Sequence, residues 1–403
     1  MAELIDQTIS INITEQTYLD LGTWLSAEAD YSQEQLTRLQ REESYLPLIS
    51  LANEYWLTGP LANQLQKAEF WLVLPVQLRS YLLELEKLYL QRSLAMQQET
   101  MFACDILLQA NIKVVILKGA ASLFNGVLKP ISNRFMSDID LLVADEKQSA
   151  CEQLLKLQGY YPQPDDFDLE AHGHHHAPPL IRDNAICYVE LHRRALKKSI
   201  STVLQADEIW QHAIPLSLSE NVHVLQLHPT HQIILSIAHS ELQDSGYSDK
   251  HLDLRQLLNL QFISTCFHEQ IDWQTVQQHF YRAKQSHVLT AMLYKAYRLL
   301  NLLTPITDIY DSHGKEHFEA SLVLNTKNER NVSASKFISK KLAGYKREVI
   351  IDLYGDDGRF ALLTGRLKHL RRHFQMLLAR IAQKRFTGGS CKQKQSSNSY
   401  GEN

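Results

Sequence analysis

Two aspartates in the segment SDIDLLV have the spacing of a metal-binding pair. Only Ile139 separates Asp138 from Asp140, and alternate side chains of a strand point to the same face. Two carboxylates on one face of an apolar strand repel each other and lose hydration, so they need a positive partner. A divalent metal is the simplest partner, and Mg²⁺ favours carboxylate oxygens together with substrate phosphates. The pair therefore predicts a metal site that serves phosphate chemistry.

A third acid stands in a second apolar segment, ICYVELHRR. Glu190 lies between Val189 and Leu191, and it shares a strand face with Tyr188 and His192. A lone acid in such a strand also needs a partner for its charge. We therefore expect Glu190 to be a third carboxylate of the same site, with His192 as either a supporting side chain or a substrate contact.

A glycine ends an earlier apolar run, VVILKG, just before a segment expected to be helical. Gly119 would let the backbone approach a phosphate, and the helix N-terminus would offer free N–H groups. Lys118 and Arg134 could add cationic contacts. A phosphate cradle beside three carboxylates predicts two-metal phosphoryl or nucleotidyl transfer.

The order of these motifs resembles the uncharacterised nucleotidyltransferase family of the polymerase-β-like superfamily. With the later segments HPTHQIILSIAHS, HLDL and IDW, the resemblance covers roughly residues 80–280. It implies an α+β fold, with a small mixed β-sheet nucleotidyltransferase core flanked by helices and followed by a mostly helical region. It implies metal-binding carboxylates at Asp138, Asp140 and Glu190, and a phosphate turn at Gly119.

The resemblance also implies a substrate, a reaction and a set of contacts. We expect transfer of NMP from an NTP, bound with two Mg²⁺ ions, to a hydroxyl acceptor that the sequence does not identify. The expected nucleotide contacts are Lys118, Gly119, Ala120, Arg134 and Ser137. Ala120 stands where the superfamily usually has serine or a second glycine, and the interval from Gly119 to Asp138 is longer than usual. A catalytically inactive nucleotide-binding or regulatory module of the same fold is the alternative.

The expected secondary structure places these residues on strands and at strand ends. Helical periodicity extends over residues 61–109, and a β-branched run predicts a strand over 112–116. Further expected elements are helices over 120–128 and 146–157, a strand over 137–143, a hairpin pairing 174–181 with 185–192, and helices over 229–242, over 251–262 and from Trp273 after an Asp272 cap.

The domain organisation follows from these patterns. We expect an acidic helical region over 1–79, the nucleotidyltransferase core over 80–198, a helical domain over 199–305, a C-terminal region over 306–386 and a disordered tail over 387–403.

The charge of the 403-residue chain is unevenly distributed. Residues 358–394 hold ten basic side chains and no acid, which leaves 31 basic against 45 acidic residues elsewhere. The acidic body would repel phosphates, so general nucleic-acid binding by the body is not expected. The basic amphipathic helix expected over 359–386 could pack on the acidic body, contact an anionic membrane surface or bind nucleic acid, and these alternatives stay open.

The remaining sequence features concern location and disulfides. The chain has no apolar run of 18 residues, and its start, MAELIDQTIS, lacks the pattern of a signal peptide. Its five cysteines are scattered and contain no CxxC pair, so no disulfide framework or cysteine zinc site is expected. We therefore expect a cytoplasmic protein, with peripheral attachment to the membrane through the basic helix as an open alternative.

Two groups of histidines suggest metals less directly. The run His172, His174, His175 and His176 raises the alternative of a metal-dependent phosphohydrolase, although a hairpin edge beside the site explains it as well. His231 and His239 would lie about 80° apart around one helix and two turns apart along it. That separation is too large for a shared metal, so we expect these two to pack or to form hydrogen bonds.

Overall fold

The computed structural model describes residues 12–26, 33–67, 69–162, 175–306 and 312–326. All of them belong to one unit of the chain. The expected basic helix over 359–386, the tail, and His172 and His174 lie outside these residues.

Within the described residues the strands form one mixed sheet in the order β3-β4-β5-β2-β1-β7-β6. Its strands are β1 (Val115–Ile116), β2 (Asp138–Leu142), β3 (Tyr160–Pro162), β4 (Leu180–Arg182), β5 (Tyr188–His192), β6 (Ile214–Ser217) and β7 (His223–Gln226). β2 lies between β1, which is antiparallel to it, and β5, which is parallel to it. This mixed sheet with helices around it confirms the expected α+β class.

The helices outnumber the strands, as the low glycine and proline content indicates. They are α1 (Glu15–Leu25), α2 (Gln33–Gln40), α3 (Glu42–Glu54), α4 (Thr58–Lys67), α5 (Val76–Gln109), α6 (Lys118–Ser122), α7 (Gln148–Leu157), α8 (Ala206–His212), α9 (Pro229–Ile237), α10 (Leu254–Cys266), α11 (Trp273–Arg282), α12 (Ser286–Leu300) and α13 (Ser312–Thr326). A π-helical turn, η5 (Ala238–Gln243), extends α9, and short 3₁₀ turns include η2 (Ile131–Asn133). No helix in the described ranges is long and apolar enough to cross a membrane.

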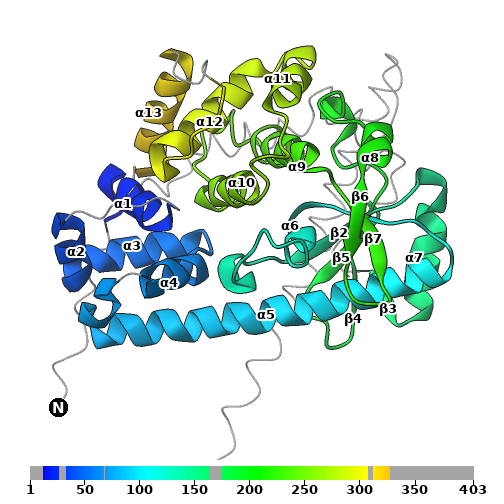
Figure 1. Cartoon of the computed structure of the whole chain (residues 1–403), viewed down its shortest axis with the longest axis horizontal. Helices are drawn as coiled ribbons and strands as arrows, with labels where there is room; N and C mark the ends of the chain where they lie inside the picture. Colours follow the sequence, from blue (N-terminus) through cyan, green and yellow to red (C-terminus); the bar gives the residue numbers. More distant parts are fainter. Residues whose placement is uncertain (1–11, 27–32, 68, 163–174, 307–311, 327–403) are drawn as a thin grey trace, which may run out of the picture. The chain divides into compact units, whose positions relative to one another are not determined.

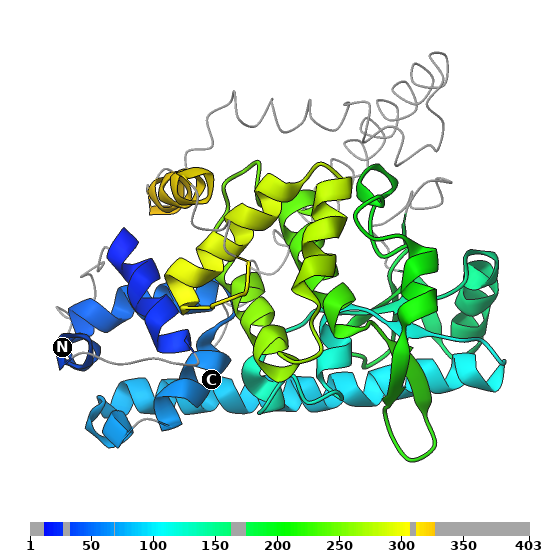
Figure 2. The ribbon, with the colours of Figure 1, turned by 45° about the horizontal axis from the view of Figure 1, so that its top comes forward.

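Helix α5 connects the N-terminal helices to the sheet. It packs against α4 at one end and against α6 and α7 nearer the sheet. In both views it runs along the lower part of the picture, from the blue helices to the strands (Figures 1 and 2). It ends at Gln109, and Asn111, with a φ of 56°, turns the chain away from the helix axis toward β1. The expected change from helix to strand is confirmed, but β1 is only Val115–Ile116 of the strand expected over 112–116.

Several expectations about the elements are wrong in detail. Of the strand expected over 174–181, the described residues form only β4 at Leu180–Arg182 and an isolated bridge at His176. The helix expected over 120–128 is the five-residue α6, because the Asn125 side chain accepts a hydrogen bond from the Val127 N–H and Gly126 adopts a φ of 83°. The mostly helical pattern expected after Ala195 is interrupted by the β6–β7 hairpin. Pro215 argues against a strand in the sequence, because proline lacks the N–H that a central strand needs. The structure accommodates this proline because β6 is an edge strand. Helix α10 begins after an Asp253 cap rather than at His251.

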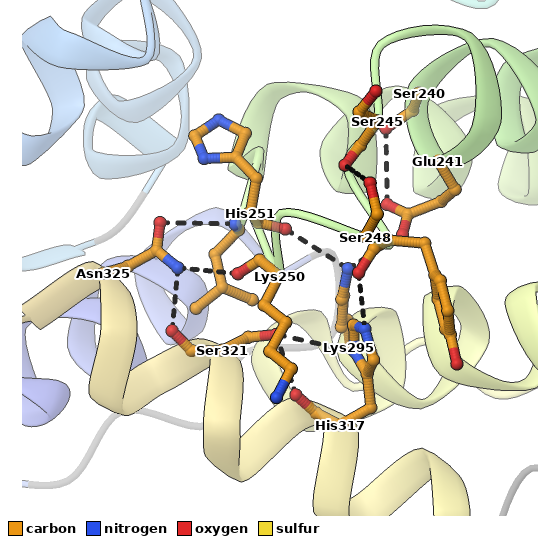
Figure 3. A network of polar contacts seen from close by, with 12 residues as sticks. Ser240, Glu241, Ser245, Ser248, Lys250, His251, Lys295, His317, Ser321 and Asn325 are labelled. Carbon is orange, nitrogen blue, oxygen red and sulfur yellow. Dashed lines mark hydrogen bonds and ion pairs between the residues drawn. The ribbon is translucent and has the colours of Figure 1, made fainter. Parts of the chain in front are cut away.

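A buried ion pair holds the loop that joins η5 to α10 (Figure 3). The Lys295 ammonium donates to Glu241 Oε2 at 2.9 Å and to the His251 carbonyl at 3.2 Å. Both charged side chains are almost completely buried. Burial raises the pKa of Glu241 even though Lys295 acts to lower it. The loop therefore depends on a carboxylate whose charge is tolerated only because of the ammonium.

Removing the ammonium tests this dependence. Lys295→Met should lower the free energy of unfolding by about 3–5 kcal/mol, because Glu241 would keep a buried charge without its partner. The double variant Glu241→Gln/Lys295→Met should lose markedly less, since no unpaired charge remains. Urea denaturation measures both, and equal losses in the two variants would contradict the dependence.

Candidate functional site

A pocket opens where the central strands meet helices α9 and α10. The turn from β1 into α6, the segment before β2 and β2 itself supply one wall, and α9, η5 and α10 supply the other. The polar side chains that line it are Lys118, Arg134, Ser137, Asp138, Asp140, Gln232, Ser236, His239, Asp244, Arg255, Gln256 and Asn259. The pocket thus joins the expected nucleotidyltransferase core to the expected helical domain.

The strand pairing brings the three expected carboxylates to neighbouring strands. Asp138 and Asp140 lie on β2, two residues apart. β5 pairs parallel to β2, with Glu190 directly beside Asp140 and His192 beside Leu142. Cross-strand partners in this register point to the same face. Asp138 and Asp140 line the pocket, whereas Glu190 lies behind Asp140 and does not.

Asp140 is an almost completely buried carboxylate between an ammonium and an imidazole. The Lys118 ammonium donates to Asp140 Oδ1 at 2.6 Å, and His192 Nε2 lies 2.8 Å from the same oxygen. Burial acts to raise the pKa of Asp140, but Lys118 and His192 together hold it well below its usual range. Asp140 is therefore ionised at neutral pH.

His192 connects two of the carboxylates. Its Nε2 lies 2.8 Å from Asp140 and 3.2 Å from Glu190 Oε2, and its ring has no exposed surface. Burial lowers the pKa of His192, but the two carboxylates outweigh burial and raise it overall. The pKa of Glu190 is lowered, because the contact with His192 outweighs the effect of burial. His192 is thus a buried positioning side chain rather than a pocket residue.

Asp138 has the opposite environment. In the described part of the chain no cationic nitrogen lies within 4 Å of its carboxylate. Burial and then the charge of Asp140 raise its pKa, and Lys118 only partly offsets them. The pocket therefore presents one carboxylate whose charge is balanced and one whose charge is not.

The site holds several side chains that can coordinate a metal ion. Asp140, Glu190 and His192 each offer a ligand atom, and these atoms all lie within 4.8 Å of one another. Asp138 adds an unbalanced carboxylate at the pocket surface. Carboxylate oxygens at this density suit Mg²⁺, so the residues present fit the ion that the sequence pattern predicts.

The first turn of α6 is tightly built. Lys118 has a φ of 48°, an uncommon conformation for a residue with a side chain. A Cβ added to Gly119 would lie 2.5 Å from Met136 Sδ and 3.0 Å from the Arg134 guanidinium. Gly119 therefore lets Arg134 pack over this turn. Ala120 is buried and does not line the pocket.

The opposite wall carries Arg255 and Asn259 on α10, which the sequence did not single out. Arg134, from the segment before β2, donates from one terminal nitrogen to Asn259 Oδ1, and its buried Nε has no hydrogen-bond partner. Burial and then the nearby charge of Arg255 lower the pKa of Arg134 to about 10. Two guanidinium groups held this close favour an anion between them. The sequence signal for Arg255 and Asn259 is their i,i+4 spacing on an apolar helix.

The π-helical turn places a second pair at the pocket. His239 Nδ1 lies 3.0 Å from Asp244 Oδ2, and burial, with the charge of Lys118, lowers the pKa of His239. π-Helical turns are often found at functional sites. The expectation that His239 forms a hydrogen bond agrees with this geometry.

The described part of the histidine run lies beside the carboxylates. His176 bridges to His192 across the sheet, and the rings of His175 and His176 lie 5.5 and 5.1 Å from that of His192. His176 Nδ1 contacts the Ala177 carbonyl at 2.7 Å. These histidines therefore border the Glu190 side of the site, away from the pocket.

Comparison with known families agrees with this geometry. A family model described as an uncharacterised nucleotidyltransferase matches residues 42–303. The chain belongs to this nucleotidyltransferase family. No curated protein matches it. The match begins before the region of motif resemblance and includes α3 and α4. The matched region covers both walls of the pocket, so it includes the carboxylates of β2 as well as Arg134 and Arg255.

The two aspartates should differ in their effect on stability. At pH 7 without metal, Asp138→Asn should leave the free energy of unfolding unchanged or raise it, because the folded state raises the pKa of Asp138 and so opposes its charge. Asp140→Asn should lower it by about 3 kcal/mol, because Lys118 and His192 would lose their buried counter-charge.

The pH dependence of these effects separates them further. The folded-state pKa of Asp140 is lowered, so its stabilisation is present above the unfolded value near 3.8 and is lost as the pH falls below that value. The penalty of Asp140→Asn should therefore shrink on acidification. Urea denaturation between pH 7 and pH 3 measures it. A penalty of the same size in both variants would contradict the assigned charge environments.

Proposed function

We propose that this protein transfers NMP from a magnesium-bound NTP to a hydroxyl acceptor and releases pyrophosphate. The observation that supports this most is the charge pattern of one pocket. Its strand wall carries Asp138, Asp140 and Arg134, and its helical wall carries Arg255. Carboxylates suit the metal ions, and guanidinium groups suit the phosphates that those ions accompany.

The carboxylates would hold the metal ions. Asp138 and Asp140 would together hold both ions. Glu190 would be a further ligand of the ion nearer the acceptor hydroxyl. When bound, Mg²⁺ neutralises triphosphate charge and lowers the pKa of a coordinated hydroxyl. His192 keeps Asp140 and Glu190 ionised and close together, since it contacts both. Glu190 has a lowered pKa, so it is available to accept the acceptor proton.

The cationic groups would bind the triphosphate. Lys118 balances Asp140 in this structure, and its side chain also borders the pocket. Lys118 would be free to contact a phosphate when a metal ion balances Asp140 in its place. Arg134 and Arg255 line the same pocket, and the free buried Nε of Arg134 is a donor without a partner. Gly119 contributes by leaving room for Arg134 over the turn.

A catalytically inactive nucleotide-binding module of the same fold is the second candidate. Two observations favour it: Asp140 is already paired with Lys118, and Glu190 does not line the pocket. Such a module would bind Mg·NTP through the same arginines without releasing pyrophosphate. The two candidates therefore differ in turnover and not in binding.

Substitution of Glu190 separates the candidates. With α-labelled NTP, Mg²⁺ and a pool of small-molecule and protein acceptors, Glu190→Gln should reduce label transfer by about 100-fold or more, because it removes a group acting on the acceptor side. Its affinity for Mg·NTP, measured by calorimetry, should change by less than about threefold.

Two variants accompany Glu190→Gln. Asp138→Asn should lose both transfer and metal-dependent NTP binding. Glu220→Gln, which changes an exposed glutamate in the β6–β7 turn, is the matched control and should behave like the unaltered protein. Full transfer activity in both Glu190→Gln and Asp138→Asn would refute the proposed site, and NTP binding without transfer in the unaltered protein would favour the inactive module.

The arginines should discriminate between nucleotides by phosphate number. Arg255→Ala and Lys118→Ala should weaken NTP binding by about tenfold and NMP binding much less, because the lost contacts are to the outer phosphates. Arg282→Ala removes an exposed arginine on α11 and serves as the control. Calorimetry with both nucleotides measures the ratio. An unchanged ratio of NTP to NMP affinity would place the triphosphate elsewhere.

A further inference from the structure

A second cluster of metal-ligating side chains lies away from the pocket. Glu208 on α8, His231 on α9 and His279 on α11 each offer one ligand atom, and these atoms all lie within 4.8 Å of one another. None of the three lines the pocket that contains Asp138 and Asp140. They come from three helices separated in sequence, so the fold brings them together.

His279 has the orientation of a metal ligand. Its Nδ1 lies 2.7 Å from the Val203 carbonyl, to which it can only donate. Nδ1–H is thereby engaged, which leaves Nε2 as the ring nitrogen that can coordinate an ion. That nitrogen points to Glu208, at 3.1 Å from Oε1. Metal-ligating histidines usually donate their other ring N–H to a carbonyl in this way, because the bond fixes the ring and raises its basicity.

His231 has an unexplained buried polar atom. Only 5% of its surface is exposed, and its Nδ1 has no hydrogen-bond partner. A buried nitrogen without a partner costs about 1–3 kcal/mol. The rings of His212, His228 and His279 lie 5.4, 6.4 and 6.0 Å from its own. The His231 ring therefore lies among three other imidazoles, and no hydrogen bond within the described residues explains its position.

The charge state of His231 also suits coordination. Burial, and then the charges of His279, His212 and His228, lower its pKa to about 4. The ring is neutral at pH 7, and a neutral imidazole is the form that binds a metal.

We propose that Glu208, His231 and His279 bind one divalent transition-metal ion of the zinc type. Two imidazole nitrogens and one carboxylate form a ligand set for zinc with a fourth position left open, whereas Mg²⁺ prefers oxygen ligands alone.

The ion would link α8 and α11 to the first turn of α9. Gln232 and Ser236 on the same helix line the pocket, so the ion would stabilise one pocket wall without contacting substrate. This site is independent of the transfer reaction, and its test needs no activity measurement.

Cobalt binding to the full chain tests the proposal. Protein stripped with a chelator is titrated with Co²⁺ in excess Mg²⁺, and visible absorption reports histidine and carboxylate coordination. We expect one equivalent to bind, with a rise in melting temperature that Zn²⁺ reproduces. Glu208→Gln and His279→Gln should weaken Co²⁺ binding by at least about tenfold. Glu208 is partly exposed, so its variant should fold even if His279→Gln does not.

Two further variants control for other sites. His268→Gln removes an exposed histidine that lies beside Glu269 and should bind Co²⁺ as the unaltered protein does. Glu190→Gln alters the other cluster with metal-ligand spacing and should also leave the cobalt spectrum unchanged. The proposal is overturned if the unaltered protein shows no cobalt band, or if the band survives in Glu208→Gln and is lost in Glu190→Gln.

Discussion

A buried carboxylate needs a cation, and the charge balance at Asp140 determines how the rest of the site is arranged. Lys118 reaches it from the turn after β1, and His192 reaches it from β5. The same histidine contacts Glu190, so one imidazole connects two acids on neighbouring strands. The strands must pair in register for this to occur, and they do. Asp138 is left as the carboxylate whose charge a bound metal ion would balance.

The helical half of the chain supports this arrangement from the other side of the pocket. Asn259 on α10 accepts a hydrogen bond from Arg134, which links that helix to the segment before β2. The start of α10 depends on its Asp253 cap, and the loop before it depends on the buried pair of Glu241 and Lys295. The Asp253 cap and the buried pair of Glu241 and Lys295 therefore help to hold α10, with its Arg255, against the pocket.

The sequence predicted the strand wall better than the helical wall. Alternation placed Asp138 and Asp140 on one face, and the apolar segment around Glu190 indicated a neighbouring strand. The role of His192 stayed open, because periodicity does not say which two acids a buried ring contacts. Arg255 was missed, since its helix is capped by a residue within the HLDL segment and only tertiary packing turns it to the pocket. The β6–β7 hairpin was missed because Pro215 disfavours a strand unless it is at an edge.

The most direct measurement is a crystal structure with Mn²⁺ and a non-hydrolysable NTP, in which anomalous scattering locates the metal ions. We expect manganese at the carboxylates of Asp138 and Asp140, with Glu190 next to the ion farther from the triphosphate, Lys118 no longer bonded to Asp140, and the triphosphate against Arg134 and Arg255. Lys118 still bonded to Asp140, with manganese and nucleotide absent from this pocket or bound elsewhere, would contradict the account.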